Sequence, residues 1–129
     1  MGTGTPIGRV RGLGSAKDGT RHWWHQRVTA GSNILLMVWF ILSLARMPAY
    51  DHGSVVKWMG SPWVSIPLVL LVISVFYHFR LGLQVVIEDY QHHERRVAAM
   101  LALNLFVVAT GAMAIFSILR IAFTAGVPA

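Results

Sequence analysis

The sequence contains no cysteine. Without thiols, the chain cannot form a disulfide, hold an iron–sulfur cluster by itself, or attach haem through thioether bonds. Any haem bound here must therefore be held by non-covalent packing and axial ligation.

Charged residues are also scarce, at 12% of the 129 residues, whereas soluble domains usually carry about 25%. Three segments contain no Asp, Glu, Lys, Arg or His, namely Val28–Ala45, Trp58–Tyr77 and Val97–Leu119. Each approaches or exceeds the roughly 18 apolar residues typical of a transmembrane helix. The sequence thus predicts an all-α membrane protein with three transmembrane helices in a single domain (1–129), leaving no room for a soluble catalytic domain.

The spans are expected at about residues 28–44, 63–87 and 97–123, after a polar segment over residues 1–27. The loop between the first two spans is expected to hold a short interfacial helix around Val55–Met59. A polar turn over Gln91–Arg96 should join the second and third spans.

The net charge of +6 is typical of nucleic-acid binding, but membrane orientation explains it better. Most basic residues flank the first span or join the second and third: Arg9, Arg11, Lys17, Arg21, Arg27, Arg95 and Arg96. Only Arg46 and Lys57 lie in the loop on the other side. The positive-inside rule then predicts a cytoplasmic N-terminus and a periplasmic C-terminus.

His78 is an ionisable residue within the second apolar segment, where such a group usually has a function or a partner. As a haem ligand, it would bind iron through one ring nitrogen while the other meets a second-shell acceptor. Gly82, four residues on, leaves a gap on the same helix face. The alternative is a histidine hydrogen-bonded within a helix bundle. One clear ligand in this chain means that a six-coordinate haem needs a second histidine from a partner.

Asp89 and Tyr90 follow where the second span leaves the membrane. Eleven positions at roughly 100° and 1.5 Å each place Asp89 on the face of His78, about 16 Å away along the axis. A tyrosine hydroxyl can donate a hydrogen bond to a quinone carbonyl, and a neighbouring carboxylate can orient a basic partner or pass protons. The alternative is an ordinary pair at the membrane surface.

Three further polar positions have open roles. Arg27, with His22 and His25, either meets haem propionates or a quinone-site carboxylate, or is only a topology signal. Arg80 points away from the His78 face, so it either snorkels to the surface or pairs with a group on a partner subunit. Asn104 is expected to hydrogen-bond between helices.

The segment YHFRLGLQVVIEDY, Tyr77–Tyr90, resembles the second span of the smaller membrane-anchor (D) subunit of succinate dehydrogenase, respiratory complex II. The three spans and the arginine before the first span agree with that resemblance. The IEDY ending and the QHHERR turn look alphaproteobacterial or mitochondrial in type. The resemblance extends from about Arg21 to the end, although its specific part is this motif.

The resemblance implies that His78 is an axial ligand of haem b, which is shared with a cytochrome b556-type C anchor subunit. It implies that Tyr90 and Asp89 contact ubiquinone and that Arg27 lies near the quinone or the propionates. FAD and iron–sulfur clusters would belong to a flavoprotein subunit and an iron–sulfur subunit. His22, His25 and Arg80 acquire no role from it.

The predicted function is therefore that of a membrane anchor in succinate:ubiquinone oxidoreductase, itself without succinate chemistry. The expected location is the bacterial inner membrane, with the mitochondrial inner membrane as the alternative. Two other functions remain open: an anchor of a fumarate reductase or another haem b quinone oxidoreductase, and a non-enzymatic membrane scaffold or transporter subunit.

Overall fold

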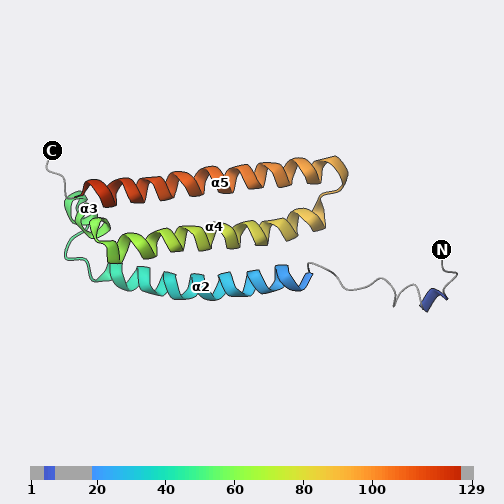
Figure 1. Cartoon of the computed structure of the whole chain (residues 1–129), viewed down its shortest axis with the longest axis horizontal. Helices are drawn as coiled ribbons and strands as arrows, with labels where there is room; N and C mark the ends of the chain where they lie inside the picture. The colour runs from blue at the N-terminus through green and yellow to red at the C-terminus, as the bar shows by residue number, and fades with distance from the viewer. Residues whose placement is uncertain (1–4, 8–18, 126–129) are drawn as a thin grey trace.

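The computed structural model describes residues 5–7 and 19–125. Three long helices run side by side: α2 (Gly19–Ala45), α4 (Pro62–Tyr90) and α5 (His93–Thr124) (Figure 1). A short helix, α3 (His52–Gly60), lies in the connection between α2 and α4. The predicted all-α class is confirmed for these residues.

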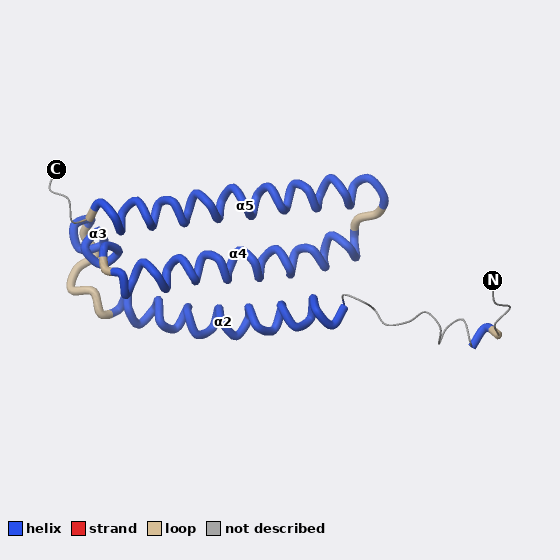
Figure 2. Tube along the Cα trace, in the orientation of Figure 1, coloured by secondary structure: helices blue, strands red, loops and turns tan. Residues whose placement is uncertain are grey.

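The three long helices form a flat layer with α4 in the middle (Figure 2). Helix α4 contacts both α2 and α5, whereas α2 and α5 do not contact each other. Within the described residues, the broad faces of α4 are therefore largely uncovered, apart from its contact with α3, and no large side chain is fully buried. Such a layer can bury its apolar side chains only in lipid or against other subunits.

Among the described residues, α2, α4 and α5 are long and apolar enough to cross a membrane. A helix satisfies its backbone hydrogen bonds internally, which the bilayer core demands because it offers no water. The predicted number of spans and their order are therefore confirmed, and the protein is a multi-pass membrane protein.

Helix α2 begins earlier than the sequence suggested. The polar segment expected over residues 1–27 overlaps this helix, because Gly19–Arg27 is the first part of α2. No proline interrupts this stretch, so the helix continues beyond its apolar part into a region where polar side chains are solvated. Residues 1–4 and 8–18 of the expected segment lie outside the described residues.

Helix α3 confirms the short helix predicted around Val55–Met59 and extends it on both sides. Asp51 caps its start, because the carboxylate accepts hydrogen bonds from the Ser54 hydroxyl at 2.7 Å and the Ser54 N–H at 3.2 Å. These bonds, the hydroxyl first, hold the pKa of Asp51 below its usual value. At the other side of α3, the Trp58 indole donates to the Ser43 hydroxyl of α2 at 2.9 Å.

The turn between α4 and α5 is shorter than predicted. Only Gln91 and His92 lie outside a helix, so the turn expected over Gln91–Arg96 was wrong beyond His92. His93 makes the reversal tight by adopting a positive φ of 52°, a conformation that costs a non-glycine residue about 1–2 kcal/mol.

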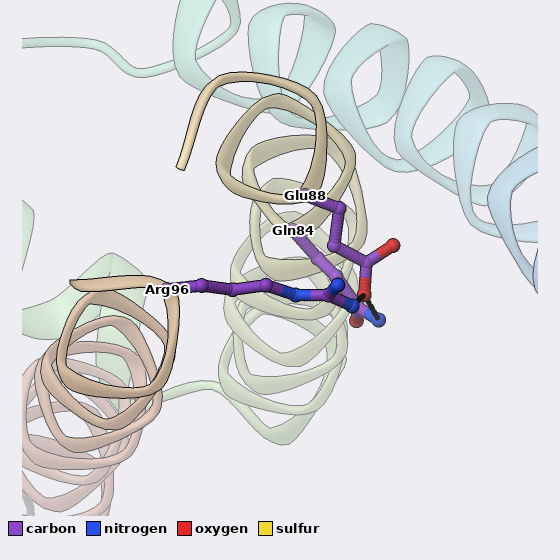
Figure 3. A network of polar contacts seen from close by, with 3 residues as sticks. All are labelled: Gln84, Glu88 and Arg96. Atoms are coloured by element: carbon purple, nitrogen blue, oxygen red, sulfur yellow. Dashed lines mark hydrogen bonds and ion pairs between the residues drawn. The ribbon is translucent and has the colours of Figure 1, made fainter. Parts of the chain in front are cut away.

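A small polar network joins the two helices beside this turn (Figure 3). Arg96 of α5 pairs with Glu88 of α4 at 3.2 Å, and Gln84 donates to the same carboxylate at 3.1 Å. The two ionic side chains are 50% and 37% exposed, so the pair contributes at most about 1 kcal/mol. Its consequence is local, because it fixes the separation of α4 and α5 next to Asp89 and Tyr90.

Arg80 and Asn104 connect α4 to α5 farther along the layer. The Arg80 Nε donates to the Asn104 side-chain oxygen at 2.6 Å. The interhelical role predicted for Asn104 is thus confirmed, and Arg80 has a partner within its own chain. Gly111 of α5 also faces α4, because a Cβ added there would lie 3.8 Å from the Phe76 ring.

Candidate functional site

A groove of about 480 Å³ lies between the first half of α2 and the second half of α4. Its size is within the range of roughly 300–1,000 Å³ typical of ligand pockets. It is lined by Gly19, His22, Trp23, Gln26, Arg27, Ala30, His78, Gly82 and Val85. The structure therefore brings His78 and Arg27, which are distant in sequence, to one site.

His78 is held in this groove by Thr29 of α2. The Thr29 hydroxyl oxygen lies 2.9 Å from the Nδ1 of His78 and 2.8 Å from the His25 carbonyl oxygen. A hydroxyl has one proton, and the carbonyl can only accept it. When the Thr29 hydroxyl donates its proton to the His25 carbonyl oxygen, the Nδ1–H of His78 donates to the Thr29 hydroxyl oxygen. The Nε2 of His78 then keeps a free lone pair. This is the tautomer that an imidazole needs to bind a metal ion through Nε2.

Gly82 leaves open space on the same face of α4. A Cβ placed there would meet only the Gln26 amide nitrogen, at an ordinary contact distance of 3.7 Å. His78, Gly82 and Val85 all line the groove, which agrees with the one-face spacing expected from the sequence. The wall beside the imidazole is therefore flat enough for a planar group.

Two polar atoms of the groove lining are buried without a hydrogen-bond partner, the Nε2 of His22 and the Oε1 of Gln26. Buried polar atoms are nearly always paired, so such exceptions need an explanation. Both atoms belong to α2 and are closed off from solvent in this chain. A polar group bound in the groove would pair with them only after these side chains reorient.

Arg27 lines the groove and also lies over the Trp23 ring, with 5.4 Å between the guanidinium carbon and the ring centroid. This cation–π contact holds the side chain at the mouth without neutralising its charge. Arg27 has no ion pair within the described part of the chain. Its charge is therefore available to an anionic group at the groove.

Asp89 and Tyr90 are not part of this groove. Tyr90 is 77% exposed and borders a separate hollow of about 570 Å³, formed with Gln91–Arg95. Asp89 is also exposed, one further step along the His78–Gly82–Val85 face. The structure thus separates the proposed ligand from the proposed quinone pair, and both remain open toward neighbouring subunits.

A family model described as the transmembrane subunit of succinate dehydrogenase/fumarate reductase matches residues 1–113. The chain belongs to this family. The match includes the groove, His78 and the Asp89–Tyr90 pair, so the resemblance inferred from Tyr77–Tyr90 is confirmed at the level of the family.

Several curated relatives support the assignment. The chain is 35% identical over 105 residues to the succinate dehydrogenase hydrophobic membrane anchor subunit of Rickettsia bellii, covering 81% of this chain and 84% of that protein. It is 31% identical over 116 residues to the protein of the same name from Paracoccus denitrificans, covering 90% of both chains. No solved structure matches the chain.

Sequence reasoning did not identify Gln26 and Thr29 at this site. Gln26 lines the groove, and the Thr29 hydroxyl contacts His78. Beside the groove, the Tyr77 hydroxyl lies 3.0 Å from the Nδ1 of His25, which gives His25 a partner on α4. The sequence carried no signal for Thr29, because its contact with His78 depends on how α2 and α4 lie side by side.

Proposed function

We propose that this chain is a membrane anchor subunit of succinate:ubiquinone oxidoreductase and that it holds haem b through His78. The relatives bear the name of that enzyme's hydrophobic anchor subunit. The observation that carries the proposal is the Thr29–His78 hydrogen bond, because it orients an imidazole with a free Nε2 in a groove between two membrane helices.

The groove would hold a haem from one side through the imidazole of His78, and Gly82 would leave room for it beside α4. The described residues contain no cluster of three or more His, Cys, Asp or Glu side chains placed to hold a metal ion. A single ligand on an open groove therefore suits a haem that is completed by an imidazole of a second anchor subunit.

Arg27 and the unpaired polar atoms of α2 suit the edge of that haem. The guanidinium would pair with a propionate or a quinone-site carboxylate, and the Nε2 of His22 would accept or donate one further hydrogen bond. When bound, haem b supplies one-electron redox chemistry beside the quinone.

Ubiquinone is the proposed substrate at the exposed end of α4. Its reduction requires two electrons, two protons and a hydrogen-bond donor at a ring carbonyl. The Tyr90 hydroxyl would donate that bond, and Asp89 would orient a basic partner or relay protons from water. Because both side chains are exposed in this chain, partner subunits would form the remaining walls of the quinone pocket.

The partners would be a cytochrome b556-type C anchor subunit, an iron–sulfur subunit and a flavoprotein. The last two would carry the iron–sulfur clusters and FAD, and this chain would perform no succinate chemistry. The basic residues around α2 and the α4–α5 turn favour a cytoplasmic location for that end, which puts the C-terminus in the periplasm of a bacterial inner membrane. The soluble subunits would dock at the same end.

The family also contains fumarate reductase anchors. The names of the relatives favour the succinate dehydrogenase, and the relative rates of ubiquinone and menaquinone reduction would distinguish the two. Family membership argues against an unrelated scaffold or transporter subunit.

Purification of the tagged chain from its native membrane tests the proposal directly. The detergent-solubilised complex should contain three other subunits and flavin, and its dithionite-reduced minus oxidised spectrum should show b-type haem bands. A colourless preparation that lacks flavin would refute the proposal.

Thr29→Val should disturb the haem while the helices remain assembled. Valine keeps the shape of threonine but removes the acceptor, so the Nδ1–H of His78 loses its bond and the ring loses its fixed orientation. Losing an outer partner of a metal-bound histidine usually weakens metal binding about 10–100-fold. We expect a shifted haem spectrum and midpoint potential, measured by redox titration, and Thr29→Ser should restore both.

Thr110→Val is the matched control for the Thr29→Val and Thr29→Ser variants. The Thr110 hydroxyl makes the same kind of bond to a carbonyl four residues earlier, at 2.6 Å to Phe106, but contacts no histidine. If Thr29→Val leaves the spectrum and the potential unchanged in an assembled complex, Thr29 does not position the ligand.

A further inference from the structure

Arg46 and Lys57 are basic residues that the orientation of the chain does not explain. They lie at the end of the layer that carries α3, whereas the other basic clusters of the described residues, Arg21–Arg27 and Arg95–Arg96, lie at the opposite end. Within residues 19–125, neither side chain has an ion pair or a hydrogen bond. A cation kept at this surface without a partner is available to an external anion.

These two side chains border a groove of about 850 Å³ between α2, α3 and the start of α4. Below the cations, the wall of the groove is apolar and consists of one face of α2, with Leu35, Val38 and Leu42. The groove is therefore amphipathic: its charges are at one end and its hydrocarbon surface extends along the helix.

The floor of this groove is built from packed aromatic side chains. Trp39 and Trp58 lie against a buried hydrophobic cluster, Val64, Leu68 and Ile118. The Trp58 indole is fixed by its hydrogen bond to Ser43, and the Phe40 and Trp58 rings contact each other at a centroid distance of 6.2 Å. The hollow is thus built mainly on packed helices, and the loop residues Arg46, Met47 and Pro48 complete its wall.

The length of the groove matches one half of a bilayer. Eleven residues separate Leu35 from Arg46 along α2, which is about 16 Å at 1.5 Å per residue. Half of the hydrocarbon core of a bilayer is about 15 Å thick. A molecule with an anionic group at the surface and a hydrocarbon chain reaching the bilayer midplane would fill this shape.

We propose that this groove binds one anionic phospholipid, with the phosphate between Arg46 and Lys57 and an acyl chain along Leu42, Val38 and Leu35. Asp51 forms no ion pair with either cation within residues 19–125, and its carboxylate accepts hydrogen bonds from Ser54. The site lies at the opposite end of the layer from the His78 groove and does not depend on the haem or quinone assignments. The bound lipid would seal α3 against α2 in the assembled complex.

The first experiment compares lipid retention by purified complexes. Each complex is stripped with detergent, titrated with phosphatidylglycerol or phosphatidylcholine, and examined by native mass spectrometry. The unaltered complex should hold one more phosphatidylglycerol than the Arg46→Gln/Lys57→Gln double variant. Because each cation near a membrane surface contributes roughly fivefold to the binding of anionic lipid, the double variant should bind about 25-fold more weakly.

Arg120→Gln is the matched control, because it removes one positive charge at the same end but lines none of this groove. It should retain the lipid. Leu42→Trp should expel the lipid without changing any charge, which tests the acyl-chain part of the site. Equal retention in the double variant, or equal binding of both headgroup classes, would overturn the proposal.

A photo-crosslinking residue at Val38 identifies the occupant in the intact complex. An adduct with the mass of a phospholipid is expected after illumination of native membranes. A cross-link to another subunit would show that a protein helix fills the groove, and the lipid proposal would then be wrong even if the complex retained annular lipid.

Discussion

His78→Ala should remove most of the haem b from the assembled complex. The substitution deletes the imidazole that the groove presents and leaves Thr29 without its partner on α4. Loss of a second-shell partner alone commonly weakens metal binding about 10–100-fold, so loss of the ligand itself should lower haem affinity by at least about tenfold. Any haem that remains should have lost one axial ligand and should absorb at different wavelengths.

The measurement is a redox difference spectrum normalised to the subunit content on a gel. His92→Ala is a suitable control, because His92 is an exposed turn residue outside the groove. The control should keep both the amount and the spectrum of the haem. If the His78→Ala complex assembles with unchanged haem occupancy and spectrum, His78 is not the ligand.

Tyr90→Phe should reduce ubiquinone reductase activity by roughly tenfold while succinate oxidation with an artificial dye persists. The change removes only the hydroxyl, and one hydrogen bond to a reacting group is worth about 1.4 kcal/mol, which corresponds to a factor of ten in rate. The two assays separate the quinone step from flavin chemistry, because the dye accepts electrons before they reach this subunit. The exposed position of Tyr90 predicts little effect on the stability of the chain.

Tyr50→Phe controls for the loss of a tyrosine hydroxyl. Tyr50 is similarly exposed but lies at the opposite end of the layer, where its hydroxyl donates to the Leu44 carbonyl at 3.3 Å. It should leave both activities intact. If Tyr90→Phe lowers both activities equally, the residue acts in assembly and the quinone role is contradicted.

The sequence was sufficient to predict the spans and the groove face of α4. Uncharged segments of transmembrane length gave three helices in the right order, and helical spacing placed His78 and Gly82 on one surface. Asn104 was recognised as an interhelical residue because an amide in an apolar segment needs a partner. These predictions succeeded because each rests on a property of a single helix.

The start of α2 was not predicted, and the α4–α5 turn was predicted too long, for one physical reason. Hydropathy marks where a helix enters the membrane but not where its backbone stops being helical. Polar residues such as those of Gly19–Arg27 can remain helical in water, and His93 shortens the turn by adopting a backbone conformation that is unusual for histidine.

Thr29 is the clearest example of a residue whose role could not be predicted from the sequence alone. Nothing in the spacing of α2 distinguishes it from the other small polar residues nearby, Ser32 and Asn33. Its role emerges only when α2 and α4 are set side by side in antiparallel orientation and the hydroxyl falls 2.9 Å from His78. The groove bordered by Arg46 and Lys57 likewise exists only because α3 folds back beside α2 and α4.

The sequence alone determined that this is a three-span helical membrane protein with an imidazole in its second span, because hydrophobic length and the cost of burying a polar group are properties of each segment. Only the tertiary structure decided which residue holds that imidazole, that the helices form an open layer, and where the two grooves lie. Those features depend on the relative depth and rotation of neighbouring helices, which the sequence of any one helix does not specify.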